Sequence, residues 1–300
     1  MVGRSRRWTE TERARVEKEL QSRRRTSRVV GAGFDIAELD VHVGGGILAG
    51  AVAFRLFLFL VPFVYVLFTL LGWVAKAVNQ NPEHLAKVLG ITGILASAVV
   101  GTQSISVPSQ ILLLVGAAFA TLITANSLVK TLFVVHWLVW GVPRAKPSGL
   151  RPVAATIGLA LIMTVLSVAT NAIRSQLGLP GSLLVVALVT GLAFVLWWWI
   201  SWRLPHAAMS PQHLVPGAVF VAIGADVMHL LTTYWIGAVV ARKSHTYGAI
   251  GIALAVLLWV YVFGRILVAS AGVNATLWRR EHPPGAEPPG PGSVTPRNPA

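Results

Sequence analysis

The chain of 300 residues contains no cysteine and few charged residues. The lack of cysteine excludes disulfides, zinc–thiolate sites, iron–sulfur clusters and a cysteine nucleophile. Charged residues make up 12% of the chain, about half of the roughly 25% that is typical of soluble domains. Together with a hydrophobic share of 55% and a mean hydropathy of +0.68, this composition indicates a membrane protein.

Acidic residues are scarce beyond the N-terminal segment. Seven of the 11 Asp and Glu residues lie in residues 1–40, and between His84 and Arg280 the only acid is Asp226. Reactions that need several carboxylates, such as two-metal phosphodiester hydrolysis, therefore lack their metal ligands. The sequence also has no HExxH, GxSxG or phosphate-binding glycine-rich motif. We expect no enzyme, no catalytic or metal site and no cofactor.

Six apolar runs reach the length of about 20 residues that is needed to cross a bilayer. A shorter run at 85–100 is expected to be interfacial or re-entrant, and SHTYGAIG at 244–251 is expected to form a compact polar turn. The sequence therefore predicts an all-α integral membrane protein with six transmembrane helices. The predicted spans are about 47–75, 111–140, 152–173, 182–202, 214–240 and 248–277.

The distribution of positive charge orients these spans. With both termini in the cytoplasm, the cytoplasmic segments hold 17 of the 25 Lys and Arg residues, the outside segments hold five, and three lie within spans. Treating 85–100 as a seventh span reduces the contrast to about 13 against eight. The positive-inside rule favours six spans with both termini inside. The net charge of +14 is then explained by topology, so we expect no nucleic-acid partner.

The composition divides the chain into three parts. Residues 1–46 are predicted to be a basic cytoplasmic segment, 47–278 the six-helix transmembrane domain, and 279–300 a disordered Pro/Gly-rich tail. The arginines of the first part suit contact with anionic lipid. Membrane lipids, anionic ones included, are the expected partners, with a small-molecule or lipid substrate of unknown identity. A homo-oligomer is compatible with the sequence.

Four predicted spans carry a charged residue: Arg55, Lys130, Asp226 and Arg265. Such a charge costs about 2.5–3.5 kcal/mol at the bilayer centre, and at 1.5 Å per residue all four fall about 12–18 Å from the cytoplasmic side. Arg55 and Lys130 can alternatively snorkel to the interface, whereas Asp226 needs a cation, water or a proton. Pairing Asp226 with one base leaves about two positive charges, which predicts a cytoplasm-facing polar cavity for an anionic group.

Two polar residues share helix faces with these charges. His229 follows Asp226 by three residues, and Asn126 precedes Lys130 by four, so each pair lies on one face. An acid–histidine pair either relays protons or forms a structural hydrogen bond, and both interpretations stay open. The predicted substrate cavity consists of Arg55, Lys130, Arg265, Asp226, His229 and Asn126.

Two further patterns concern architecture. The spacing Gly46-x-x-x-Gly50 permits close helix packing at the start of the first span. The sequence WWWISWRLP at 197–205 is typical of an interfacial aromatic belt at the cytoplasmic end.

Several stretches resemble the YihY/BrkB family of bacterial inner-membrane proteins, over about residues 34–278. The last two spans, LVPGAVFVAIGADVMHLLTTYW and HTYGAIGIALAVLLWVYVFGRILVASAGVNATLW, are the most specific. GGILAGAVAFRLFLFLVPF and LVKTLFVVHWLVWGVPR are similar to the first two spans of the family. Many members have Gly-Ala-Glu-x-Asn-Ala near the end, where this chain has Gly272 in place of Glu, so no role of that acid transfers. This departure, together with Arg265, is similar to the actinobacterial branch.

The resemblance implies a six-helix fold in the bacterial inner membrane and no settled biochemical activity. An older name that ties the family to a ribonuclease is implied to be a misassignment, in agreement with the scarcity of carboxylates. The leading hypothesis is a transporter or flippase-like protein for an anionic or amphipathic substrate. The alternative is a non-transporting envelope scaffold, whose function would lie in the ends of the chain. A membrane hydrolase is the third hypothesis, and the predicted spans lack the group of carboxylates that such an enzyme needs.

Overall fold

The computed structural model describes residues 28–77, 79, 106–143, 153–158, 161, 186–231 and 237–282, and in this part every regular element is helical. Besides a helix over 186–203 and a short helical segment at 153–158, the elements are α2 (Arg28–His42), α3 (Gly45–Ala77), α6 (Val107–Trp140), the 3₁₀-helix η1 (Pro211–Leu214), α8 (Val215–Leu231) and α9 (Gly237–Glu281).

Helices that are long and apolar enough to cross a membrane confirm the predicted class of fold. They match the first, second, fourth, fifth and sixth predicted spans. Of the third, 152–173, only 153–158 and 161 are described, and the segment 85–100 lies outside the described residues. Six spans with both termini inside therefore stay a prediction. The five candidate spans are Gly45–Ala77, Val107–Trp140, Val186–Arg203, Pro211–Leu231 and Val256–Glu281.

The predicted turn at 244–251 is wrong, because α9 runs without a break from Gly237 to Glu281. At 1.5 Å per residue, these 45 residues make a helix about 67 Å long. Glycine and polar residues favour a turn in water, but a helix keeps every backbone hydrogen bond within its own segment. That advantage is large in apolar surroundings.

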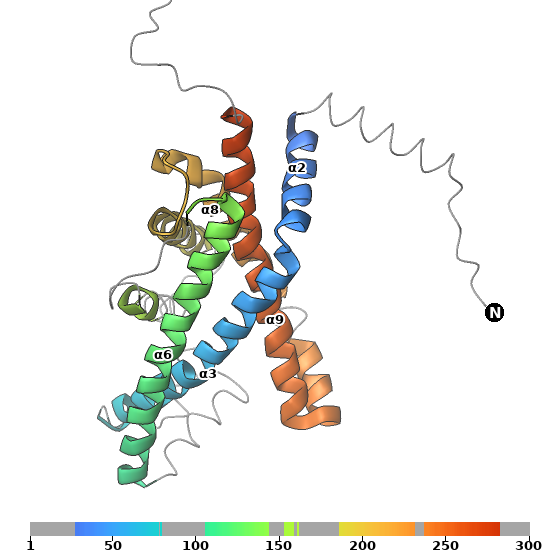
Figure 1. Cartoon of the computed structure of the whole chain (residues 1–300). Helices are drawn as coiled ribbons and strands as arrows, with labels where there is room; N and C mark the ends of the chain where they lie inside the picture. The colour runs from blue at the N-terminus through green and yellow to red at the C-terminus, as the bar shows by residue number, and fades with distance from the viewer. Residues whose placement is uncertain are drawn as a thin grey trace, which may run out of the picture.

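Helix α9 packs against α3, and both lie beside α6 (Figure 1). The closest approach is at Gly264, where an added Cβ would lie 2.8 Å from the carbonyl oxygen of Ala49. The predicted contact residues are not the ones used: a Cβ on Gly50 would meet nothing within 4 Å, and one on Gly46 would meet only the Tyr261 hydroxyl at 3.9 Å. The small-residue contact therefore lies on the neighbouring face of α3.

Helix α8 packs on α9 through a second glycine. The backbone N–H of Gly217 donates a hydrogen bond of 2.7 Å to Oδ1 of Asn274. A Cβ on Gly217 would lie 2.6 Å from the carbonyl oxygen of Ser270. The helix over 186–203 joins the same contact, because Trp197 Nε1 donates to Ser270 Oγ at 3.0 Å. These bonds fix three membrane-capable helices against one another.

Helix α2 was not predicted from the sequence, which assigned its residues to a cytoplasmic segment. It lies beside the C-terminal half of α9 (Figure 1). A two-residue turn at Val43 and Gly44 then leads into α3, and Gly44 adopts φ of 67°, a conformation that favours glycine. Leu39 and Val43 pack against the core. The N-terminal segment thus contributes a helix to the membrane-capable bundle.

Candidate functional site

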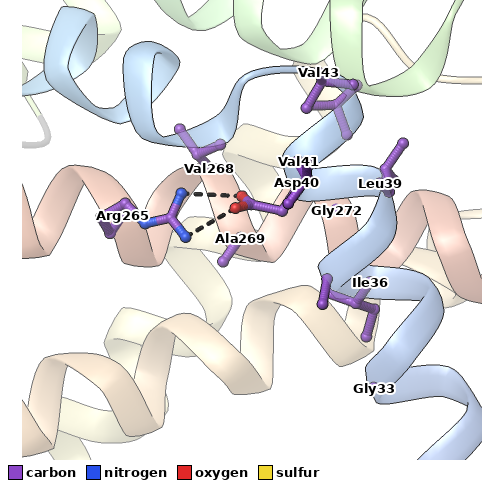
Figure 2. Close-up of a pocket in the computed structure, with 12 residues that line it drawn as sticks. Gly33, Ile36, Leu39, Asp40, Val41, Val43, Arg265, Val268, Ala269 and Gly272 are labelled. Carbon is purple, nitrogen blue, oxygen red and sulfur yellow. Dashed lines mark hydrogen bonds and ion pairs between the residues drawn. The ribbon is translucent and has the colours of Figure 1, made fainter. Parts of the chain in front are cut away.

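A bidentate ion pair joins α2 to α9. The guanidinium of Arg265 donates from Nη1 to Asp40 Oδ1 and from Nη2 to Asp40 Oδ2, each at 3.0 Å (Figure 2). Two parallel charge-assisted hydrogen bonds of this kind are among the strongest polar contacts in proteins. The side chains nevertheless keep 35% and 26% of their surface exposed. The pair is therefore well formed and still open to a ligand.

A second ion pair joins the same two helices near the end of α9. Arg280 Nε donates to Asp35 Oδ2 at 2.7 Å, and Arg280 Nη2 lies 2.6 Å from the same oxygen. The exposed fractions of these side chains, 34% and 26%, are close to those of the first pair. Arg280 follows Arg265 by 15 residues, or about 22 Å along the helix. The two pairs therefore differ in their position along α9 rather than in exposure.

A cavity of about 290 Å³ lies between α2 and α9 and contains the Arg265–Asp40 pair (Figure 2). We call it the α2–α9 cavity. Its wall is apolar apart from this pair, so it combines a charged group with a hydrophobic surface. The other lining residues are Gly33, Ile36, Ala37, Leu39, Val41 and Val43 from α2 and the following turn, Val139 from α6, and Val268, Ala269 and Gly272 from α9.

Of the six residues predicted to form a cavity, Arg265 alone lines the α2–α9 cavity. Arg55 and Lys130 are exposed, and among the described residues neither has an ion-pair partner. The guanidinium carbon of Arg55 lies 6.0 Å from the ring centroid of Phe54. Asn126 is half-buried and His229 is exposed. The described contacts do not bring these residues to Arg265, so the single cavity for all six stays a prediction.

Asp226 contacts a hydroxyl group rather than a base. Thr190, on the helix over 186–203, places its Oγ1 at 2.9 Å from Asp226 Oδ1 and 2.8 Å from Asp226 Oδ2. The same Oγ1 lies 2.9 Å from the carbonyl oxygen of Val186. The predicted ion pair of Asp226 with a base is not found in the part of the chain that the structure describes. Of the three bases predicted within the spans, Arg265 pairs with Asp40 instead.

Asp40 and Thr190 are the two residues that the sequence did not point to. Asp40 lies in the stretch VVGAGFDIAELDVH, which has an apolar stripe, and that stripe could have identified a packed helix. The stretch was instead grouped with the charged residues before it. Thr190 is neutral, and its pairing with Asp226 across 36 residues leaves no pattern in the sequence.

Arg203 lies over two of the tryptophans that were predicted to form an aromatic belt, and the position of this belt at the cytoplasmic interface stays a prediction. The guanidinium carbon of Arg203 lies 4.9 Å from the ring centroid of Trp199 and 5.8 Å from that of Trp202, within the range of cation–π contacts. Among the described residues there is no group of three or more His, Cys, Asp or Glu side chains that could hold a metal ion.

Comparison with known proteins gives one family and two relatives. The family described as "Virulence factor BrkB" matches residues 44–293. "Putative ribonuclease-like protein YfkH" of Bacillus subtilis (strain 168) is 31% identical over 84 residues, which cover 28% of this chain and 30% of the relative. "Inner membrane protein YhjD" of Escherichia coli (strain K12) is 30% identical over 90 residues, which cover 30% of this chain and 26% of the relative. The match therefore spans about a third of each relative or less, and no solved structure matches.

Proposed function

The chain belongs to the BrkB family that its motifs resemble, and we propose that it moves an anionic, amphipathic substrate across the bacterial inner membrane. In this proposal it is a transporter or a flippase-like protein, and the α2–α9 cavity is the substrate site. The observation that carries the proposal is a bidentate Arg–Asp pair set in an otherwise apolar cavity.

The cavity suits a molecule with an anionic head and an apolar tail. A phosphate or carboxylate group can accept the same two hydrogen bonds from Arg265 that Asp40 accepts now, because guanidinium matches both groups in its fork geometry. The exchange leaves Arg265 with a counter-charge throughout. The released Asp40 carboxylate, whose side chain is 26% exposed, then needs water as its partner.

The size of the cavity is consistent with a headgroup and part of one acyl chain. Ligand pockets commonly have volumes of about 300–1,000 Å³, and the α2–α9 cavity, at about 290 Å³, lies at the small end. Ile36, Leu39 and Val268 supply the apolar wall beside Arg265. The remainder of a lipid-like tail would stay in the hydrocarbon layer.

The proposal is tested with purified protein in liposomes. The probe is phosphatidylglycerol with a fluorescent acyl chain, and a membrane-impermeant reductant reports its movement between leaflets. We expect Arg265→Gln to slow this movement by about tenfold or more, because one charged contact of about 1.5–3 kcal/mol is lost. Phosphatidylcholine with the same label should move more slowly, since its headgroup has no net charge.

The matched control is Arg280→Gln, which removes the other arginine that joins α2 to α9 and does not line the cavity. It should change the rate of lipid movement by less than about twofold relative to the wild type, which corresponds to less than 1 kcal/mol in the activation barrier. Equal rates for wild type and Arg265→Gln would contradict the proposal. The scaffold alternative predicts this result, and it also predicts that removing 1–27 or 283–300 harms cells more than Arg265→Gln does.

A further inference from the structure

Asp40 occupies the position in the α2–α9 cavity that a substrate headgroup would take beside Arg265. Each of its carboxyl oxygens accepts one hydrogen bond of 3.0 Å from the guanidinium. The remaining residues that line the cavity have apolar side chains or are glycines. In the described part of the molecule, Arg265 is therefore the source of the hydrogen bonds and of the counter-charge that the Asp40 carboxylate has.

The ends of two helices lie beside this carboxylate, and their effects oppose each other. Asp40 is two residues before the end of α2, where the helix dipole disfavours an anion. It also lies against Gly45, the first residue of α3, so closely that a Cβ on Gly45 would overlap the carboxyl group. The start of a helix favours an anion. The contact with Gly45 also limits how far the carboxylate can move, so that Asp40 stays in the cavity when its partner changes.

The exchange of partners at Arg265 therefore creates a requirement at Asp40. When a phosphate group accepts the two hydrogen bonds of Arg265, the Asp40 carboxylate loses both of its donors. Its side chain is 26% exposed, so water reaches only part of it. A polar group that loses its hydrogen bonds in apolar surroundings is costly. A ligand that carries its own donor beside the phosphate removes this cost.

We infer that the cavity selects substrates in which a hydroxyl group lies close to an anionic phosphate. The phosphate accepts from Arg265 and the hydroxyl donates to Asp40, so both members of the ion pair keep a partner in the bound state. This inference rests on the proposed function, which takes a substrate with a net negative charge, and the donor is therefore a neutral hydroxyl. Asp40 then determines specificity, since a site built to bond a hydroxyl discriminates against analogues that lack it. Lipids with a glycerol or another polyol headgroup belong to this class.

Two anionic lipids that differ in their hydroxyl groups test the inference in the wild type. Phosphatidylglycerol and phosphatidylmethanol with the same acyl chains carry the same phosphodiester charge, and the headgroup of phosphatidylmethanol has no hydroxyl. Native mass spectrometry of the full chain measures the dissociation constant of each lipid. We expect phosphatidylglycerol to bind about fivefold more tightly, the factor that corresponds to one hydrogen bond of about 1 kcal/mol. Equal dissociation constants would overturn the inference.

The variant Asp40→Ala should abolish the preference, because it removes the acceptor of the hydroxyl group. Asp35→Ala is the matched control and should keep the preference, since Asp35 pairs with Arg280 and does not line the cavity. A preference for phosphatidylglycerol that persists in Asp40→Ala would show that other groups cause it, and the inference would be wrong. If Asp40→Ala fails to fold, which circular dichroism and gel filtration check, the comparison of the two lipids in the wild type still decides.

Phosphatidylethanolamine with the same acyl chains is the third probe, because its ammonium group also donates hydrogen bonds. Tighter binding of this lipid than of phosphatidylglycerol would overturn the assignment of a hydroxyl. The proposed function fails separately. If phosphatidylglycerol binds with the expected preference and does not move between leaflets, the inference holds and movement of this lipid is refuted. If both anionic lipids bind equally and move, the proposed function holds and the inference is wrong.

Discussion

The two aspartates near the middle of the bundle have opposite partners. Asp40 faces the Arg265 guanidinium across the α2–α9 cavity, with two hydrogen bonds of 3.0 Å. Asp226, between α8 and the helix over 186–203, faces only the Thr190 hydroxyl in the described part of the chain. A guanidinium supplies a counter-charge and two charge-assisted hydrogen bonds, whereas a hydroxyl group supplies one neutral donor. Among the described residues, the same residue type therefore has a charged partner in one region and an uncharged partner in the other.

The largest effect on stability is expected from Arg265→Gln. This change leaves Asp40 without its counter-charge in an apolar cavity, at a cost of about 3 kcal/mol in the free energy of unfolding. Reversible unfolding in mixed detergent micelles measures this loss. The double variant Arg265→Gln/Asp40→Asn should recover most of it, because no orphan charge remains. A double variant as unstable as the single one would show that the unpaired Asp40 carboxylate does not cause the loss of stability.

The next effect separates the two regions physically. Gly217→Ala places a Cβ 2.6 Å from the Ser270 carbonyl oxygen, and such overpacking costs about 1–3 kcal/mol. Because it pushes α8 from α9, it should lower the free energy of unfolding in the same assay and leave the α2–α9 cavity unchanged. Gly50→Ala is the matched control, since its Cβ would meet nothing within 4 Å. Equal unfolding free energies for the two variants would contradict the packing described for Gly217.

A smaller effect is expected where Thr190 meets Asp226. Thr190→Val removes the hydroxyl group that lies 2.9 and 2.8 Å from the two Asp226 carboxyl oxygens and should lower the free energy of unfolding by about 1 kcal/mol. Thr190→Ser is the matched control and should cost less, because it keeps the hydroxyl group. The same unfolding assay compares the two variants. Equal losses would show that the contact of Thr190 with Asp226 does not contribute to stability.

The smallest effect is expected at the outer ion pair. Arg280→Gln removes a pair whose exposed fractions are close to those of the Arg265 pair. It lies one residue before the end of α9, where solvent screens charge, so the cost should be about 0.2–1 kcal/mol. Asp35→Asn should change the unfolding free energy less in this variant than in the wild type. A cost equal to that of Arg265→Gln would show that the position along α9 does not distinguish the two ion pairs.

Local patterns predicted the membrane class and the positions of five spans, because length and hydropathy are properties of single segments. They did not predict α2 packed on α9, since the contact of Asp40 with Arg265 joins residues 225 positions apart. The turn at 244–251 was predicted from residues that favour turns in water, and α9 forms a helix there. For Asp226 the sequence predicted a cation, water or a proton, whereas the partner found among the described residues is the Thr190 hydroxyl. Thr190 could not be found, because nothing in its neighbourhood marks it.

The different partners of the aspartates can be tested in one experiment, because the chain contains only three: Asp35, Asp40 and Asp226. Selective ¹³C labelling of the aspartate side-chain carboxyl groups gives one signal for each in a solid-state NMR spectrum of the protein in bilayers, and Asp40→Asn and Asp226→Asn assign two of them. We predict that Arg265→Gln shifts the Asp40 signal and leaves the Asp226 signal in place, because Arg265 donates two hydrogen bonds to Asp40. An Asp40 signal that does not respond to Arg265→Gln would contradict the ion pair on which the α2–α9 cavity depends.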